Sequence, residues 1–282
     1  MEIRAGQVKV LREKTGAGMM DCKKVLVEAG GDLERAVDLL RERGLGKARN
    51  KAGRATSDGR IAAWIAGDGR SASLVELNCE TDFVARTDDF GALCAEFAEL
   101  AGGHDVNSTE ALLALPLGEG SAQDRLVAGI AKLGENIQLR RLARVNAGEQ
   151  GRISSYIHAG GKIGSLVAVE AKEPGSTKIA ALAHNLCMHV AAAAPSSISR
   201  DDLPAKEVEY ERGVLRAQAE TEGKPDKVID KMVEGRLNKF FKEVVLLEQQ
   251  LVMDPDSSVK NALAAAGAEV VAFRRFQLGE EI

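Results

Sequence analysis

The sequence has few cysteines, and no two of them stand at the spacing of a metal clamp or a redox motif. The four are Cys22, Cys79, Cys94 and Cys187. Free cysteine behaves as a small hydrophobe, and cytosolic chains keep it reduced. The pattern therefore predicts reduced, structural cysteines in a cytoplasmic chain and gives no support for a metal site.

The sequence also lacks a long apolar run. No segment approaches the roughly 18 consecutive apolar residues of a membrane-spanning helix, and residues 1–10 do not resemble a secretory signal. We therefore expect a soluble protein that binds no membrane and stays in the cytoplasm. Hydrophobic residues nevertheless make up 45% of the 282 positions, which is enough for the cores of two or three compact units.

Positive charge is not in excess. The formal net charge is -4, so the chain has no overall basic field for phosphates, and we expect no direct contact with nucleic acid. The charge is uneven, because residues 1–54 hold 13 Lys and Arg against 8 Asp and Glu. This basic N-terminal segment favours a partner with an acidic surface.

Signatures of the common enzyme classes are absent. The sequence contains no phosphate-binding GxxxxGK[ST] loop, no GxSxG and no HExxH. The glycines between 160 and 164 fall in a predicted hairpin rather than at a strand-to-helix turn. We therefore expect no cofactor and no covalent chemistry.

One segment, HNLCMH, comes near to a metal constellation. Its candidate ligands are His184, Cys187 and His189, which fall close together on a helix. The rest of that helix is apolar, and this favours buried structural histidines over zinc ligands.

Residues 1–54 have the pattern of three short amphipathic helices, with apolar residues at helical spacing in each. Asp32 is placed to cap the third helix, and Gly44 is expected to end it. The basic residues 45–54 then link this small bundle to the rest of the chain.

An internal repeat follows. Residues 59–77 (GRIAAWIAGDGRSASLVEL) align without a gap on residues 151–169 (GRISSYIHAGGKIGSLVAV). Each copy predicts a β-hairpin, because a glycine-rich turn separates two runs of alternating and β-branched residues. A weaker echo aligns IQLRRL (residues 137–142) with VAFRRF (residues 271–276), and it predicts a third strand for each copy.

Helical patterns lie between these strands, at 88–101 and 121–133 in the first copy and at 178–193 and 259–265 in the second. The second copy also carries a long insertion. Its segments 205–219 and 226–247 predict an antiparallel helical hairpin that projects from the body, with a Gly-Lys-Pro turn between the helices.

The fold class is therefore α+β. We expect an N-terminal three-helix domain and linker over 1–54, a core N-subdomain over 55–146, and a core C-subdomain over 147–282. The helical hairpin is an insertion in the last of these, at about 205–247. Each subdomain is expected to hold a three-stranded antiparallel sheet with helices against it.

The segment ELNCETDFVAR, residues 76–86, is the most distinctive. By the repeat, Thr81, Asp82 and Phe83 correspond to Glu173-Pro174-Gly175, so the first copy has acquired a feature that its twin lacks. Thr81 can cap a new helix and Asp82 favours the positive end of its dipole. Phe83 either fills the core or serves a contact, and local chemistry leaves both open.

This segment closely resembles a signature of the bacterial elongation factor Ts family. LREKTGAGMMDCKKVL (residues 11–26) resembles the second signature of that family, and further matches include KLGENIQLRR (132–141), HAGGKIGSLV (158–167), KMVEGRLNKF (231–240) and LVMDP (251–255). The resemblance covers essentially the whole chain. It implies a ubiquitin-associated-like N-terminal bundle, a core of two subdomains and a projecting coiled-coil hairpin.

The resemblance also implies a function. Members of the family promote GDP release from the GTPase elongation factor Tu, and bind both its GDP-bound and its nucleotide-free form. The Asp-Phe of the signature inserts beside the magnesium and phosphate site of the GTPase, a role that passes here to Asp82 and Phe83 within the segment Thr81–Val84. The other expected contact residues, matched by position, are Arg12, Met19, Met20, Lys23, Lys51, Leu133, Gly134, His158, Val252 and Met253.

Several alternatives stay open from the sequence alone. Met19 lies on the apolar stripe of its helix and fits core packing equally well, whereas Met20 lies off that stripe, among lysines. Some family members continue past the last strand with another helix that grips the GTPase, a contact that is expected to be absent here or supplied in another way. Self-association into a homodimer or a two-to-two complex with the GTPase also stays open.

A rival from another class is a ubiquitin-fold-like or RNA-associated scaffold, in which the basic three-helix segment and the helical arm bind RNA or another protein without exchange activity. It predicts salt-sensitive RNA binding and indifference to guanine nucleotides.

Overall fold

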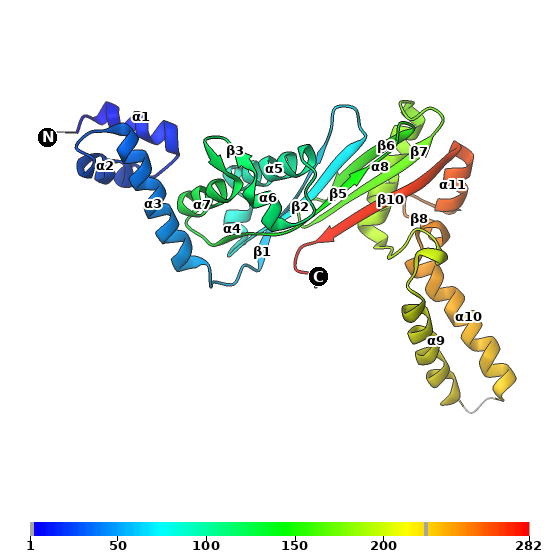
Figure 1. The fold of residues 1–282 in the computed structure, drawn as a ribbon. Helices are drawn as coiled ribbons and strands as arrows, with labels where there is room; N and C mark the ends of the chain where they lie inside the picture. The colour runs from blue at the N-terminus through cyan, green and yellow to red at the C-terminus, as the bar shows by residue number, and fades with distance from the viewer. Residues whose placement is uncertain (1–2, 223–224, 282) are drawn as a thin grey trace.

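The computed structural model describes residues 3–222 and 225–281. Along the molecule a helical bundle comes first, then one small sheet, then a second sheet, and a pair of long helices projects from the far end (Figure 1). The predicted α+β class with antiparallel sheets is confirmed. Among the described residues, none of the helices combines the length and the apolar content that crossing a membrane takes.

The bundle consists of α1 (Ala5–Thr15), α2 (Met19–Glu28) and α3 (Leu33–Lys51). Its core is small and apolar, and is formed by Val8, Leu11, Cys22, Val25, Leu26, Ala29 and Ala36. The carboxylate of Asp32 accepts hydrogen bonds from the N–H groups of Glu34 and Arg35, so the predicted cap of α3 is confirmed.

The predicted end of α3 at Gly44 is wrong, because the helix continues to Lys51 through most of the segment expected to be a linker. The cause is a tertiary contact. Gly44 packs against α7 (Ala122–Leu133), where a Cβ at position 44 would already touch Val127 and Ala131. The glycine therefore brings two helices close together and does not act as a helix terminator.

The first sheet has the strand order β1-β2-β5, with all neighbours antiparallel. Its strands are β1 (Asp58–Ile65), β2 (Ser71–Cys79) and β5 (Ile137–Asn146), and it is accompanied by α4 (Asp82–Ala85), α5 (Asp88–Gly103), α6 (Thr109–Ala114) and α7, with β3 (Pro116–Leu117) and β4 (Gly120–Ser121) forming a separate small ladder. The helices bury Phe90 and Phe97 against one face of the sheet. Sequence patterns did not predict α6, β3 or β4.

The second sheet has the order β10-β7-β6 and repeats the first. Its elements are β6 (Gly151–Ile157), β7 (Ile163–Ala171), α8 (Thr177–Ala193), α11 (Val259–Ala266) and β10 (Ala268–Gln277), with the small ladder of β8 (Gln250–Leu251) and β9 (Asp254–Ser258) beside them. Both predicted hairpins and both predicted third strands are therefore confirmed.

The sequence alignment of the two third strands differs from their structural register, however. In the structure Ile137 pairs with Cys79 and Ala268 pairs with Ala171, so Ile137 is equivalent to Ala268, not to Val271 as in the alignment of the two RR pairs. The register shifts at the same place in both sheets, at Arg140 in β5 and at Val271 in β10. The shared feature is thus a bulge at equivalent positions, and the two RR pairs are not equivalent.

The first of these bulges creates a buried charge cluster. Because a bulge lets neighbouring residues of one strand reach the same partner, Arg140 and Arg141 both bind the carboxylate of Glu76, at 3.0 and 2.6 Å. Glu76 is fully buried, and Arg141 also binds Glu280 at 2.8 Å. The cluster ties β2 and β5 to the segment that follows β10.

The two sheets also pack against each other through an apolar layer. Ile61 and Leu74 from the first sheet meet Ile153, Leu166 and Phe276 from the second. The N–H of Ile61 donates to the carbonyl of Gly161 at 2.7 Å, which joins β1 to the turn of the second hairpin. The bundle packs against the first sheet unit, where α3 contacts α7.

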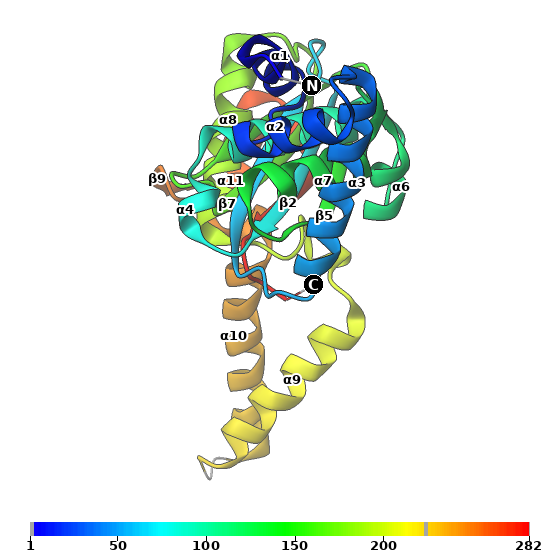
Figure 2. The same ribbon diagram turned by 90° about the vertical axis from the view of Figure 1, so that its left-hand side faces the viewer.

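The helical hairpin is formed by α9 (Ala205–Glu220) and α10 (Asp226–Val244), and it projects away from the sheets in both views (Figures 1 and 2). Its seam is apolar and includes Leu215, Ala219, Ile229, Val233, Leu237 and Phe241. Arg216 of α9 pairs with Asp230 of α10 at 3.0 Å. Of the predicted Gly-Lys-Pro turn, Gly223 and Lys224 lie outside the described residues.

The predicted end of α10 at Leu247 is wrong by three residues. The chain leaves the helix after Val244, since Val245 forms a parallel bridge with Ser197 and the N–H of Leu246 donates to the carbonyl of Ser197 at 2.9 Å. This redirection buries Leu246 under the second sheet. Phe241 occupies a buried position of the seam, and its neighbour Phe240 is half-buried against the same cluster.

The HNLCMH segment lies on α8. Cys187 and His189 are buried as expected, but His184 is exposed and packs its ring edge-on against Tyr156. Within the described part of the chain, no group of three or more potential ligands stands at metal-binding geometry. His189 instead accepts a hydrogen bond at Nδ1 from the N–H of Val252 at 3.3 Å, and its Nε2 lies 2.8 Å from Oε1 of Gln249.

This burial predicts a pH dependence of stability. Burial is the main factor that lowers the pKa of His189 below its ordinary value of 6.5. The unfolded chain then binds a proton more readily than the folded chain, so the contribution of His189 is present above about pH 6.5 and is lost as the pH falls through the folded pKa. Urea unfolding of the wild type from pH 8 to pH 5 should show this loss.

The matched variants are His189→Gln and His184→Gln, which remove a buried and an exposed imidazole from the same helix. His184→Gln should keep the acid-side slope of the wild type, whereas His189→Gln should be less stable at pH 8 and show a shallower slope. Equal slopes for the two variants would contradict the assignment.

Candidate partner-binding site

The candidate site begins where β2 ends. The side-chain oxygen of Thr81 accepts a hydrogen bond from the N–H of Val84 at 3.3 Å, and this cap starts the four-residue helix α4 at Asp82. Thr87, two residues after the end of α4, caps α5 in the same way. The predicted capping role of Thr81 is therefore confirmed.

Helix α4 divides its side chains between core and solvent. Ala85 is buried and Val84 is half-buried against the core of the first sheet. Phe83 points the other way and is 81% exposed, so the core-filling alternative for this residue is wrong. A large aromatic side chain held this far out of a folded core is the kind of group that marks an interaction site.

Asp82 lies beside Phe83 on the first turn. Its carboxylate pairs with the guanidinium of Arg86 at 2.9 Å, one helical turn later. Arg86 is exposed and Asp82 is half-exposed, so this surface pair contributes about 0–1 kcal/mol and can be exchanged for another partner at little cost.

The Thr81 segment is also held from outside by Glu135, a residue that sequence reasoning missed. One carboxylate oxygen of Glu135 accepts the N–H groups of Glu80 and Thr81, each at 3.0 Å, and the other accepts the Thr81 hydroxyl at 2.5 Å. The available signal was its place in the KLGENIQLRR match.

Three further predicted residues lie around the same turn. Gly134 ends α7 in the left-handed conformation, with φ at 81°, and Leu133 packs into the core of the first sheet. The ammonium of Lys51, at the end of α3, donates to the carbonyl of Gly134. Lys51, Leu133 and Gly134 are thus brought together next to the Thr81 segment.

The predicted residues of the bundle form an exposed group. Arg12 lies on α1, and Met19, Met20 and Lys23 lie on α2, all on the surface. Met19 is 58% exposed, so the core-packing alternative for it is wrong, and Met20 is 64% exposed. Met20 and Lys23 line a shallow depression on α2.

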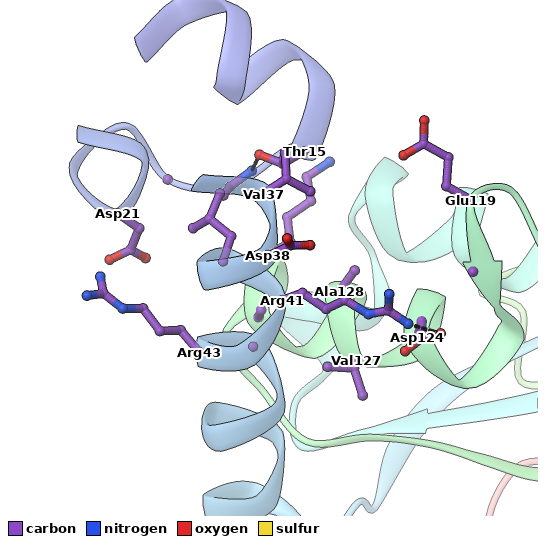
Figure 3. A pocket seen from close by; sticks show the side chains of 17 residues that line it. Thr15, Asp21, Val37, Asp38, Arg41, Arg43, Glu119, Asp124, Val127 and Ala128 are labelled. Atoms are coloured by element: carbon purple, nitrogen blue, oxygen red, sulfur yellow. Dashed lines mark hydrogen bonds and ion pairs between the residues drawn. The ribbon is translucent and has the colours of Figure 1, made fainter. Parts of the chain in front are cut away.

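A cleft of about 440 Å³ separates this bundle from the first sheet unit, with α3 on one side and α7 on the other (Figure 3). Val37 of α3 and Val127 and Ala128 of α7 give it apolar walls. Arg41 and Asp124 point toward each other and form an ion pair at 2.7 Å. The hydrogen bond from Arg41 is the main cause that lowers the pKa of Asp124 to about 2.

The remaining predicted residues lie on the second sheet unit. His158 is exposed in the turn after β6, where its Nδ1 lies 2.9 Å from the Tyr156 hydroxyl oxygen. Val252 and Met253 are exposed at the turn between β8 and β9, on the side of the molecule from which the helical hairpin projects (Figure 1). The candidate residues therefore extend along the molecule and suit a macromolecular partner better than a small ligand.

Comparison with known proteins identifies the relatives of this chain. A family model described as "Elongation factor TS" matches residues 80–280. The chain is 45% identical over 283 residues to the elongation factor Ts of Methylococcus capsulatus, covering 100% of this chain and 94% of that protein. It is 45% identical over 287 residues to the elongation factor Ts of Clostridium perfringens, covering 99% and 94%.

The relative from Chlorobaculum parvum, again an elongation factor Ts, is 44% identical over 288 residues, covering 99% of each chain. The matched region contains α4 with its exposed Phe83, the Glu135 turn and the β8–β9 turn. With the family model matching well over half of its length and these relatives aligned almost end to end, the chain belongs to the elongation factor Ts family.

Proposed function

We propose that this protein is a guanine nucleotide exchange factor for elongation factor Tu, and that it promotes GDP release during translation elongation without covalent chemistry. Family membership supports the partner and the activity. The observation that carries the mechanism is Phe83, an aromatic side chain 81% exposed on a short helix whose cap and backbone are held in place. In this proposal Asp82 and Phe83 enter the GTPase near its magnesium and phosphate site.

The two side chains have different tasks. Phe83 acts as an apolar wedge that separates the packed elements which position the metal ligands. Asp82 leaves its surface pair with Arg86 and places a carboxylate where it competes for hydrogen bonds or repels phosphate charge. Thr81 and Val84 hold the wedge, through the cap and through the apolar core respectively.

The energy for this insertion comes from the rest of the interface. An exchange factor and a nucleotide weaken each other's binding by the same factor, so stabilising the nucleotide-free GTPase is equivalent to expelling GDP. A thousandfold faster release requires about 4 kcal/mol of differential stabilisation. In the proposal these contacts come from Arg12, Met19, Met20 and Lys23 on the bundle, from Lys51, Leu133 and Gly134 at the α7 turn, and from His158, Val252 and Met253 on the second sheet unit.

The direct test is the release of labelled GDP from elongation factor Tu with and without this protein. The sharper test is Phe83→Ala. Because the side chain is exposed, its removal should leave the melting temperature nearly unchanged. Because a buried aromatic at an interface commonly contributes about 2 kcal/mol or more, GDP release should slow at least tenfold.

Tyr210→Ala is the matched control, since Tyr210 is a 74% exposed aromatic on the helical hairpin. It should release GDP at the wild-type rate. A Phe83→Ala protein that exchanges GDP normally would refute the wedge, and a large fall in its melting temperature would return Phe83 to a structural role.

The bundle is expected to contribute affinity more than exchange rate. Met20 lies in the first turn of α2, where an added carboxylate is compatible with the helix dipole, so Met20→Asp should not destabilise the fold. The variant should raise the factor concentration for half-maximal exchange about tenfold or more while leaving the rate at saturation within twofold.

Val228→Asp provides the comparison, because Val228 is an exposed apolar residue in the first turn of α10. It should behave as the wild type in the same titration. An unchanged half-maximal concentration for Met20→Asp would remove α2 from the proposed interface.

A further inference from the structure

The short helix that carries Phe83 cannot hold its own orientation. Helix α4 has four residues, and a single turn of helix gains too few hydrogen bonds to offset the entropy of ordering it. Val84 and Ala85, which follow Phe83 in α4, pack into the core. Glu80 and Thr81, which precede the helix, are only half-buried at the end of β2. The direction of Phe83 therefore depends on what fixes those two residues.

The turn between α7 and β5 fixes them through a reciprocal pair of carboxylates. Glu135 accepts both N–H groups and the hydroxyl described above, while the carboxylate of Glu80 accepts the N–H of Asn136 at 2.7 Å. That hydrogen bond is the main cause that lowers the pKa of Glu80. Each segment thus supplies a carboxylate to the backbone of the other, and charged acceptors make the stronger kind of hydrogen bond.

The turn itself is anchored by the end of the bundle. Lys51 donates to the carbonyl of Gly134, and the side-chain amide of Asn136 donates to the carbonyl of Arg54 at 2.9 Å. The guanidinium of Arg54 in turn lies 3.4 Å from the Glu80 carboxylate. A turn held at both ends can act as a fixed support for the segment that precedes Phe83.

The internal repeat gives an independent observation. In the second sheet unit the cap glycine Gly267 is followed at once by Ala268, the first paired residue of β10. In the first unit the cap glycine Gly134 is followed by two extra residues, Glu135 and Asn136, before the equivalent residue Ile137. The first sheet unit, which has the Thr-Asp-Phe segment, is therefore also the unit that has the two-residue insertion bonded to that segment.

We infer that Glu135 is a positioning residue for nucleotide exchange: with Asn136 it forms a two-residue insertion whose hydrogen bonds hold the segment before Phe83 in the orientation that the GTPase meets. This inference rests on the proposed function. Glu135 touches neither nucleotide nor magnesium in this role and acts through Thr81 and Glu80.

The first experiment uses the full-length protein alone. Hydrogen exchange at the amides of Glu80 and Thr81 should become at least tenfold faster in Glu135→Ala and faster to a smaller degree in Glu135→Gln, which keeps the size but loses one acceptor. Glu99→Gln, a change at an exposed glutamate of α5 in the same sheet unit, should leave both amides as in the wild type. Unchanged protection in Glu135→Ala would overturn the inference.

The second experiment measures GDP release from elongation factor Tu at saturating factor. Glu135→Ala should slow release at least fivefold, Glu135→Gln less, and Glu99→Gln not at all. If Glu135 acts through Phe83, adding Glu135→Ala to Phe83→Ala should slow release no further, because residues that act on one step are not additive. If Glu135→Ala unfolds the protein, Glu135→Gln, which keeps the cap of α4 intact, is used in its place.

The outcomes separate the two claims. Slow release by Phe83→Ala beside normal release by the folded Glu135 variants overturns the positioning role alone. A further fivefold loss in the double variant also overturns it, because Glu135 would then act elsewhere. Normal release by Phe83→Ala removes the wedge itself, and the inference with it.

Discussion

The structure depends on the packing of two small sheets against each other. Each three-stranded sheet here covers one face with helices and the other with its twin. Strand β2 is buried along almost its whole length as a result. The position of α4, directly after β2, follows from this packing, because the chain leaves the core there and reaches solvent within a few residues.

Much of this fold could be predicted because it is local or repeated. The two hairpins and the helix patterns were visible in glycine-rich turns and apolar periodicity. Gly44 misled the prediction because its role is a close approach to α7, and a sequence shows a glycine without showing what it approaches. The third strands were found, but the RR pairs drew the alignment three residues out of register, since the equivalence lies in a backbone bulge that many sequences can form.

The candidate site divides in the same way. The residue types of Thr81 and Asp82 predict the start of a helix. In the structure Thr81 is the N-cap of α4 and Asp82 is its first residue. The exposure of Phe83 could not be decided from sequence, because an aromatic residue near a core fits either side of a four-residue helix. Glu135 was missed for a different reason. Two of its three hydrogen-bond donors are backbone N–H groups of residues far away in the chain, and a backbone group leaves no trace in residue identity.

The order of the strands in the second sheet has a consequence for synthesis of the chain. Strand β7 is the central strand, yet its neighbour β10 is translated only after α8 and the whole helical hairpin. Throughout that interval the nascent chain carries β6 and β7 as a two-stranded hairpin in which the outer edge of β7 is unpaired, and such an edge is open to wrong pairing and aggregation. The last strand of the first sheet ends at residue 146. The first unit can therefore fold early and cover one face of this hairpin before β10 is synthesised.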